Sequence, residues 1–174
     1  MLIMERLNKE TFHDSMKGHF AGELYNVMID NPKVLVVTAD LGFGMWNRIR
    51  DDFPDRFFNV GASELTAITA AVGMAQEGYV PFVYSITPFL LFRGAEGIRN
   101  YVNNEKANVK LIVSGRNDDY STTDGFSHFA GDDKKLLECF PNIQCCWPLT
   151  KSDMKYIVNW CINTPMPIYV NLKR

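Results

Sequence analysis

The sequence has few cysteines, little net charge and no long apolar run, and each shortage argues against a class of protein. A net charge of −2 argues against nucleic-acid binding. No apolar run approaches the roughly 18 residues that a membrane span needs, and the N-terminus, MLIMERLNKETFHD, is too charged for a signal peptide. The cysteines lack CxxC spacing, which favours reduced thiols with packing roles at Cys139, Cys145, Cys146 and Cys161. We therefore expect a cytoplasmic protein with no nucleic-acid or membrane partner.

What the chain does contain is typical of a globular domain. Its 174 residues are 47% hydrophobic and 22% charged, enough to bury a core. No internal repeat, low-complexity tract or linker composition divides it. We expect one domain over residues 1–174.

Helical and strand patterns alternate along the chain. Helices are predicted over 9–30, 63–78, 88–103, 133–139 and 151–163, and strands over 33–40, 56–61, 80–86, 109–115, 142–147 and 167–173, with a polar loop over 116–133. Strands with continuous apolar runs between helices predict an α/β fold, a three-layer sandwich around a mostly parallel sheet. Ligands of such folds bind beyond the carboxyl ends of the strands. The turn before Glu64, the turn before Phe89 and the 116–133 loop all reach that edge.

Glu64 begins the helix SELTAITAAVGMAQEG. Ser63 is a suitable N-cap and Gly78 a suitable end, and the spacing predicts a core stripe of Leu65, Ile68, Val72 and Ala75. The helix dipole alone can account for a first-turn acid, at about 0.3–1 kcal/mol. However, Glu64 follows a strand and a tight turn, and Ala67 and Ala71 leave room beside it. Such an acid could share a proton with the ring nitrogen of a flat ligand.

Three segments carry a family resemblance that covers roughly residues 33–173. They are VTADLGFG, FPDRFFNVGASELTAITAAVGMAQEGYVPFVYSITPFLLFRGAEGIRN and TDGFSHFAGDD, in that order. Together they resemble the pyrimidine-binding domain of transketolase-type thiamin diphosphate enzymes. The resemblance is greatest to deoxyxylulose phosphate synthases and to the C-terminal subunits of split transketolases. It implies the pyrimidine-domain fold and thiamin diphosphate as cofactor.

The resemblance implies two catalytic residues. Glu64 matches the acid that hydrogen-bonds the aminopyrimidine ring and favours the tautomer that deprotonates the reactive thiazolium carbon. His128, in DGFSH, matches a histidine that lines the substrate channel and assists proton transfers on substrate oxygens. His13 and His19 are placed on the first helix without a catalytic role.

Further positions are implied to bind cofactor or substrate. Phe89 matches the aromatic that packs on the pyrimidine, with Thr87 and Pro88 as N-cap and first residue of its helix. Phe92, one turn on, would extend this wall, although ordinary core packing remains an alternative for both phenylalanines. Asp40 matches an acid near the cofactor. Arg116 matches a phosphate-binding arginine, and Arg93 is a second candidate for binding the substrate's anionic group.

The sequence also departs from the family pattern. Phe126 and Phe129 replace smaller or polar residues, which leaves the substrate open between a ketose phosphate and a 2-oxo acid. No Gly-Asp-Gly element followed by a suitable Asn is present to hold Mg²⁺ and the diphosphate, so this chain is predicted to supply no metal ligand. The family's third domain is also missing from this sequence.

We therefore expect a separate subunit with the diphosphate and Mg²⁺ domain, in a two-plus-two heterotetramer. The leading hypothesis is the pyrimidine-binding subunit of a split transketolase-like enzyme, inactive alone, that makes or breaks a carbon–carbon bond beside a carbonyl. Alternatives are a subunit of a 2-oxo-acid decarboxylase and a non-catalytic scaffold that retains the fold.

Overall fold

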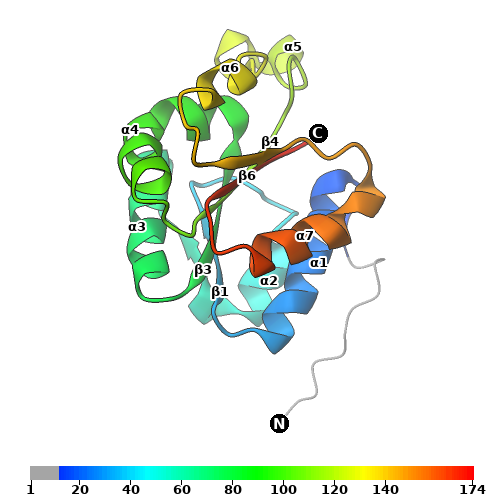
Figure 1. Ribbon diagram of the computed structural model, residues 1–174. Coiled ribbons are helices and arrows are strands. Elements are labelled where there is room, and N and C mark those ends of the chain that lie inside the picture. The colour runs from blue at the N-terminus through cyan, green and yellow to red at the C-terminus, as the bar shows by residue number, and fades with distance from the viewer. Residues whose placement is uncertain (1–11) are drawn as a thin grey trace.

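The computed structural model describes residues 12–174, and a six-stranded sheet organises them (Figure 1). The strands are β1 (Val34–Thr38), β2 (Phe57–Asn59), β3 (Val80–Ile86), β4 (Lys110–Ser114), β5 (Gln144–Cys146) and β6 (Ile168–Leu172). They lie in the order β2-β1-β3-β4-β6-β5, and each neighbouring pair is parallel. The predicted parallel α/β sandwich is confirmed.

Helices cover both faces of this sheet. Figure 1 shows α1, α2 and α7 on one face and α3 and α4 on the other. The helical segments are α1 (Met16–Asp30), α2 (Asn47–Asp52), η2 (Pro54–Arg56), α3 (Glu64–Gln76), η3 (Phe89–Arg93), α4 (Ala95–Gly97), η4 (Ile98–Asn104), α5 (Ser121–Asp124), η5 (Phe126–His128), α6 (Asp133–Leu137), η6 (Lys151–Asp153) and α7 (Met154–Asn163).

Alternate side chains of the four central strands, β1, β3, β4 and β6, enter two separate cores. On β1, Val34 and Val36 pack into the core beneath α1 and α7, whereas Val37 packs into the core beneath α3. All five β1 residues are buried. A strand that is covered on both sides needs apolar residues at every position, which explains the continuous apolar runs in the sequence.

Several boundaries differ from the sequence prediction. The first helix begins at Met16 because the Ser15 hydroxyl accepts a hydrogen bond from the Gly18 amide at 3.1 Å and caps it. His13 therefore precedes the helix, and residues 9–11 of the predicted helix lie outside the described residues. Helix α2 was not predicted, and the 116–133 segment contains α5 and η5 rather than a plain loop.

Helix α3 ends as predicted but buries a different stripe. Gly78 has φ +83°, and the amides of Gly78 and Tyr79 bond the Ala75 and Met74 carbonyls, a Schellman motif. The buried face consists of Glu64, Ala67, Ile68, Ala71 and Val72. Leu65 is 38% exposed, so its predicted core position is wrong. Ile68 and Val72 are buried as predicted, whereas the acid itself takes the buried first-turn position that was predicted for Leu65.

Two glycines let the segment after β3 approach α3 closely. A Cβ on Gly94 would lie 2.1 Å from Ile68 Cδ1, and one on Gly97 would lie 3.1 Å from Ile68 Cγ2. A Cβ on Gly94 would also lie 2.6 Å from the Leu90 carbonyl oxygen, so this position requires a residue without a Cβ, whereas the contact at Gly97 is tight but less restrictive. The approach brings η3 beside the first turn of α3.

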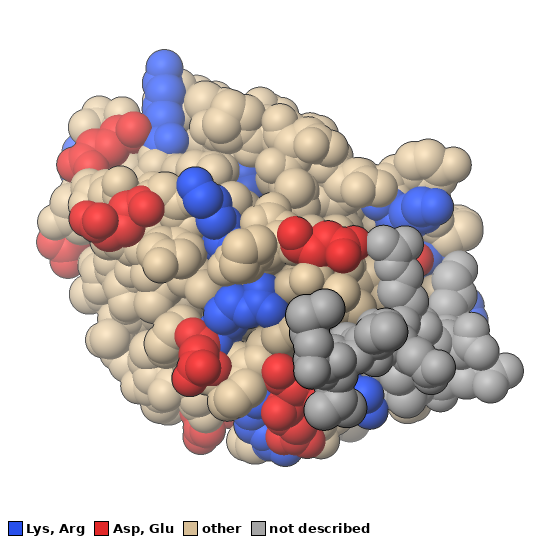
Figure 2. Space-filling view, turned by 90° about the horizontal axis from the view of Figure 1, so that it is seen from below, with Lys and Arg blue, Asp and Glu red and all other residues tan. Residues whose placement is uncertain are grey.

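The surface and the thiols agree with the composition. Acidic and basic side chains are interspersed on the face shown in Figure 2. Within residues 12–174, no helix is long and apolar enough to cross a membrane. The four cysteines are free, as predicted. Cys161 is buried in the core beneath α7 and has the predicted packing role, whereas Cys139 is exposed, so that role is wrong for Cys139.

Lys110 is a buried cation at the amino end of β4. Its Nζ donates to Asn108 Oδ1 and to the carbonyl oxygens of Thr164 and Met166, each at 2.6 Å. Burial nevertheless lowers the pKa of Lys110 to about 8, because the ammonium has lost its hydration. The side chain joins β4 to the segment between α7 and β6.

This depressed pKa predicts a pH-dependent stability. Between about pH 8 and pH 10.5 the unfolded chain keeps a proton on Lys110 that the folded chain has released, so raising the pH favours folding. Relative to Lys110→Met, the wild type should gain free energy of unfolding across this window, by up to about 1.4 kcal/mol per pH unit. Urea unfolding of both proteins at several pH values measures this difference. A difference that stays constant with pH would contradict the assignment.

Candidate functional site

Glu64 lies at the carboxyl edge of the sheet in the first turn of α3. The turn that leads to it is held by Asn59, whose Oδ1 accepts from the Gly61 amide at 3.0 Å, and Gly61 has φ +76°. Ser63 stands at the N-cap position, but its hydroxyl pairs with Thr66 Oγ1 at 2.7 Å instead of capping a backbone amide. Although first-turn acids are usually exposed, Glu64 is only 2% exposed. Its carboxylate therefore needs partners within the protein.

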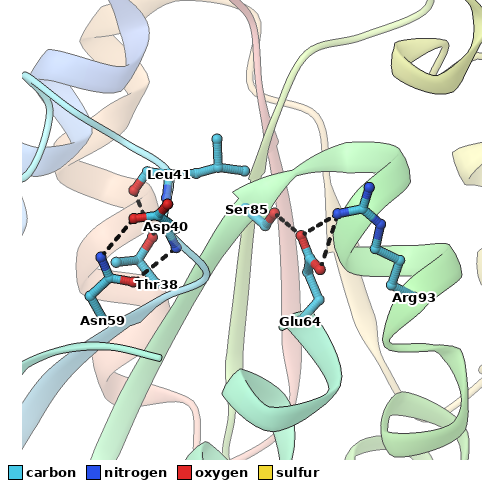
Figure 3. Close-up of polar contacts among 7 residues, drawn as sticks. All are labelled: Thr38, Asp40, Leu41, Asn59, Glu64, Ser85 and Arg93. Atoms are coloured by element: carbon cyan, nitrogen blue, oxygen red, sulfur yellow. Dashed lines mark hydrogen bonds and ion pairs between the residues drawn. The ribbon is translucent and has the colours of Figure 1, made fainter. Parts of the chain in front are cut away.

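Two side chains supply those partners (Figure 3). Ser85 Oγ, from the buried strand β3, donates to Glu64 Oε1 at 3.1 Å. The Arg93 NH1 group, from η3, lies 3.3 Å from Oε1 and 3.4 Å from Oε2. The sequence prediction missed Ser85, and its only signal was a hydroxyl within an apolar strand. Arg93 was predicted to bind a substrate anion, but here its guanidinium faces the protein's own carboxylate.

Phe89 is the centre of an aromatic and cationic stack. The Arg93 Cζ lies 3.8 Å from the centroid of the Phe89 ring. The His128 ring contacts the same phenylalanine edge-on, with centroids 4.9 Å apart. Through these contacts Glu64, Phe89, Arg93 and His128 form one contiguous group, and all four were predicted as site residues.

Phe92 does not extend this stack. The segment η3 is a π-helix, and its turn is wider than that of an α-helix. As a result Arg93, four positions after Phe89, lies over the Phe89 ring, and Phe92, three positions after it, does not. Phe92 is 52% exposed and lines a shallow groove with Leu136 and Cys139 beside α6. Its role in an aromatic wall beside the cofactor therefore stays a prediction, which the Phe89 stack does not test.

His128 ends the short helix η5, which reaches over the sheet edge. Gly125, with φ +85°, turns the chain before it, and the His128 amide donates to the Gly125 carbonyl at 3.0 Å. The His128 Nδ1 lies 3.0 Å from Ser127 Oγ. The ring is half-buried, which leaves part of it open to solvent. Exposed Phe126 and half-buried Phe129 stack on each other beside it, with centroids 5.8 Å apart.

Asp40 belongs to a second polar group at this edge. Asn59 Nδ2 donates to Asp40 Oδ1 at 3.1 Å, and the Asp40 amide donates to Asn59 Oδ1 at 2.9 Å. Asp40 is exposed and has φ +56°. Figure 3 shows it, with Thr38 and Asn59, as a group separate from Glu64. The site at this edge therefore has an exposed acid on one side and a buried acid on the other.

Arg116 is placed in a structural position rather than in the Glu64 group. Its guanidinium donates to the Asn171 carbonyl and, at 2.8 Å, to the Pro148 carbonyl. Burial lowers the pKa of Arg116. Its Nε and NH2 groups thus fasten the end of β6, and the predicted phosphate-binding role of Arg116 stays a prediction.

A buried polar network beneath the loop was not predicted. Asp133 Oδ2 accepts from Trp147 Nε1 at 2.8 Å, Tyr169 Oη at 3.0 Å and Asn171 Nδ2 at 2.8 Å. Burial and the Asp133 carboxylate raise the pKa of Tyr169. The only sequence signal was the alternation of polar residues in IYVNL. This network anchors the start of α6, and with it the segment that carries His128.

Thr87 connects that network to the start of η3. Its hydroxyl donates to the Gly115 carbonyl at 2.6 Å and accepts from Asn171 Nδ2 at 3.3 Å. The predicted N-cap role of Thr87 is therefore wrong, because its side chain bonds to the end of β4 and not to the helix amides. These two hydrogen bonds nevertheless fix the position of Thr87, and thereby the position at which η3 begins with Phe89. Within the described part of the chain, no three His, Cys, Asp or Glu side chains gather as a metal site.

Comparison with known proteins gives the site a family context. Residues 15–174 match the family described as "Transketolase, pyrimidine binding domain". The chain is 31% identical over 157 residues to 1-deoxy-D-xylulose-5-phosphate synthase from Dehalococcoides mccartyi, a match that covers 89% of this chain and 24% of that protein. It is 31% identical over 121 residues to one subunit of an apulose-4-phosphate transketolase from Actinobacillus succinogenes, covering 70% and 39%. The chain thus spans less than half of either relative.

Solved structures agree with this match. One described as "Split gene transketolase, inactive beta4 tetramer" superimposes with a TM-score of 0.80 at 28% identity, covering 92% of this chain and 51% of that one. Transketolase from Leishmania mexicana superimposes with a TM-score of 0.81 at 15% identity, covering 91% and 25%, a likeness of fold alone. From the family match over 160 consecutive positions, residues 15–174, the chain belongs to the pyrimidine-binding domains of the thiamin diphosphate-dependent transketolase family.

Proposed function

We propose that this chain is the pyrimidine-binding subunit of a split, thiamin diphosphate-dependent transketolase-like enzyme. The observation that carries the proposal is Glu64, a carboxylate 2% exposed at the ligand edge of the sheet with the Phe89 ring and His128 in the same group. An acid that is held away from water beside an aromatic face suits a flat ring that exchanges a proton. The proposed reaction makes or breaks a carbon–carbon bond next to a carbonyl.

The described residues fit the pyrimidine half of the cofactor. When bound, thiamin diphosphate supplies the carbon that attacks the substrate carbonyl. Glu64 would hold a proton at the pyrimidine ring nitrogen, and Ser85 Oγ would keep that carboxylate oriented through its 3.1 Å hydrogen bond. Phe89 would pack against the ring face, while His128 would hold or move a proton at a substrate oxygen. Asp40 would lie at the border of this site.

The proposal assigns the rest of the site to another chain. Two similar proteins are described as a transketolase subunit and as a split gene transketolase, which supports a family arrangement with separate subunits. The sequence carries no Gly-Asp-Gly element for Mg²⁺ and the diphosphate. We therefore propose a partner subunit that holds both, in a two-plus-two heterotetramer. The proposed substrate is a small ketose phosphate or a 2-oxo acid.

Reconstitution tests the proposal directly. A candidate partner is a chain with a Gly-Asp-Gly element encoded near this one. Mixing the two chains with thiamin diphosphate and Mg²⁺ should give a heterotetramer by light scattering and turnover of ketose phosphates, whereas either chain alone should be inactive. A complex that forms and binds cofactor but turns over no ketose phosphate or 2-oxo acid would support the scaffold alternative instead.

The proposed role of Glu64 predicts that a conservative substitution there causes a large loss of turnover. Glu64→Gln preserves the shape and the Ser85 contact but cannot exchange a proton, so turnover in the reconstituted complex should fall by about 10²-fold or more. The matched control is Glu77→Gln, at the exposed C-cap of the same helix, which should retain activity. Steady-state assays at saturating cofactor measure both. Wild-type turnover in Glu64→Gln would show that this carboxylate is not the proton carrier.

The role of His128 predicts a loss confined to the substrate steps. His128→Asn should lower kcat/KM for the substrate by about 10²-fold, the lower range for a positioned proton donor, and leave the cofactor Kd within about twofold. His19→Asn, in which the histidine on α1 that pairs with Asp14 is replaced, is the control. Parallel changes in kcat/KM and cofactor Kd would indicate instead that His128 only supports Phe89.

A further inference from the structure

Arg93 makes two contacts that a pyrimidine ring would also make. Its guanidinium stands against both oxygens of Glu64, at 3.3 and 3.4 Å, and its Cζ lies 3.8 Å from the Phe89 ring centroid. The Arg93 guanidinium thus contacts the buried Glu64 carboxylate and the face of the Phe89 ring at the same time. Figure 3 shows the guanidinium pointing at the Glu64 carboxylate from η3.

A guanidinium and an aminopyrimidine share the chemistry that these two partners recognise. Both are flat, both carry N–H donors in their plane, and both stack on aromatic rings. In the function proposed above, the ring nitrogen bonds Glu64 and the ring face lies on Phe89. Because those positions are filled by Arg93, the ring and the guanidinium cannot occupy them at the same time.

We propose that Arg93 is a latch that closes the pyrimidine site of this chain, and that it must leave before the cofactor ring can enter. This inference rests on the proposed function. The guanidinium of this latch pairs with the buried Glu64 carboxylate and so offsets the cost of burying that charge. When the ring arrives, it takes over the hydrogen bond and the stacking, and Arg93 turns toward solvent.

The surroundings of Arg93 allow that movement. The Glu64 side chain is 1% exposed, but the Arg93 side chain is 52% exposed, so the arginine approaches the site from the solvent side. The guanidinium has Glu64 as its one ion-pair partner within 4.0 Å among the described residues. The residue that follows it, Gly94, ends the π-helical segment. The arginine can therefore release its contacts without unpacking the core.

A permanent counter-ion would behave differently from a latch. If Arg93 served only to hold Glu64 in place, its removal would weaken the binding of a pyrimidine. If it blocks the site, its removal strengthens binding, because the ring no longer competes with an ion pair and a cation–π contact. The direction of the change separates the two roles.

The test uses the whole chain and the free aminopyrimidine alcohol that forms one half of thiamin. This probe carries the ring without the diphosphate, so it requires neither Mg²⁺ nor the partner subunit. Ligand-observed NMR titration should show that Arg93→Met binds the probe about fivefold more tightly than the wild type, a factor that suits two contacts of surface strength. Arg99→Met is the matched control, since Arg99 is an exposed arginine that donates to the Asn100 side chain, and this variant should bind as the wild type does.

A second readout follows the latch itself. The Arg93 side-chain Nε–H resonance, identified by its loss in Arg93→Met, should move toward the position of a solvated arginine when the wild type is saturated with probe. Equal or weaker binding by Arg93→Met, or an unmoved resonance at saturation, would overturn the latch.

The variant Glu64→Gln separates this result from the proposed function. If the probe binds wild type and Arg93→Met equally but binds Glu64→Gln more weakly, the latch is wrong and the pyrimidine site stands. If the probe binds none of these proteins, both the latch and the pyrimidine site are contradicted. If Glu64→Gln in the Arg93→Met background keeps the gain, the probe binds elsewhere and the latch is again wrong.

Discussion

Glu64 places a carboxylate where water does not reach it, and burying an unpaired charge costs several kcal/mol. The surrounding elements are arranged to offset that cost. β3 supplies the Ser85 hydroxyl, η3 supplies the Arg93 guanidinium, and α3 carries the acid in its first turn. These three elements meet because Gly94 and Gly97 allow the segment after β3 to pack against Ile68. The requirement to satisfy one acid thus explains the local architecture of the edge.

The parallel sheet explains why chemistry collects there. Since helices cover both faces, the strand interiors accept few polar groups, and functional side chains gather beyond the carboxyl ends. The buried polar groups beneath that edge instead hold neighbouring segments of the chain together. The Asp133 carboxylate accepts hydrogen bonds from three side chains, and the Arg116 guanidinium donates to the carbonyls of Pro148 and Asn171. Together they hold the chain before and after His128, which lets a short helix present that ring to Phe89.

Sequence motifs anticipated the gathering of Glu64, Phe89 and His128 but not the geometry between them. Helical periodicity placed Phe92 beside Phe89, and the π-helix put Arg93 there, since a wider turn changes which residues share a face. The same error of phase placed Leu65 in the core, because the periodicity of apolar residues could not count Glu64 as buried. Thr87 was assigned to a helix cap by residue type, whereas its hydroxyl donates to the Gly115 carbonyl after β4.

Local features of the chain were enough to establish the parallel α/β fold and the family, and to predict the edge at which a site lies. Apolar runs, turn residues and ordered motifs carry that information, and each can be recognised without knowing what lies nearby in space. Only the folded chain shows that Arg93 pairs with Glu64 and stacks on Phe89, and that Arg116 faces carbonyls. The sequence determines which side chains are charged. The tertiary packing determines which opposite charge or carbonyl oxygen lies within hydrogen-bonding distance of each one.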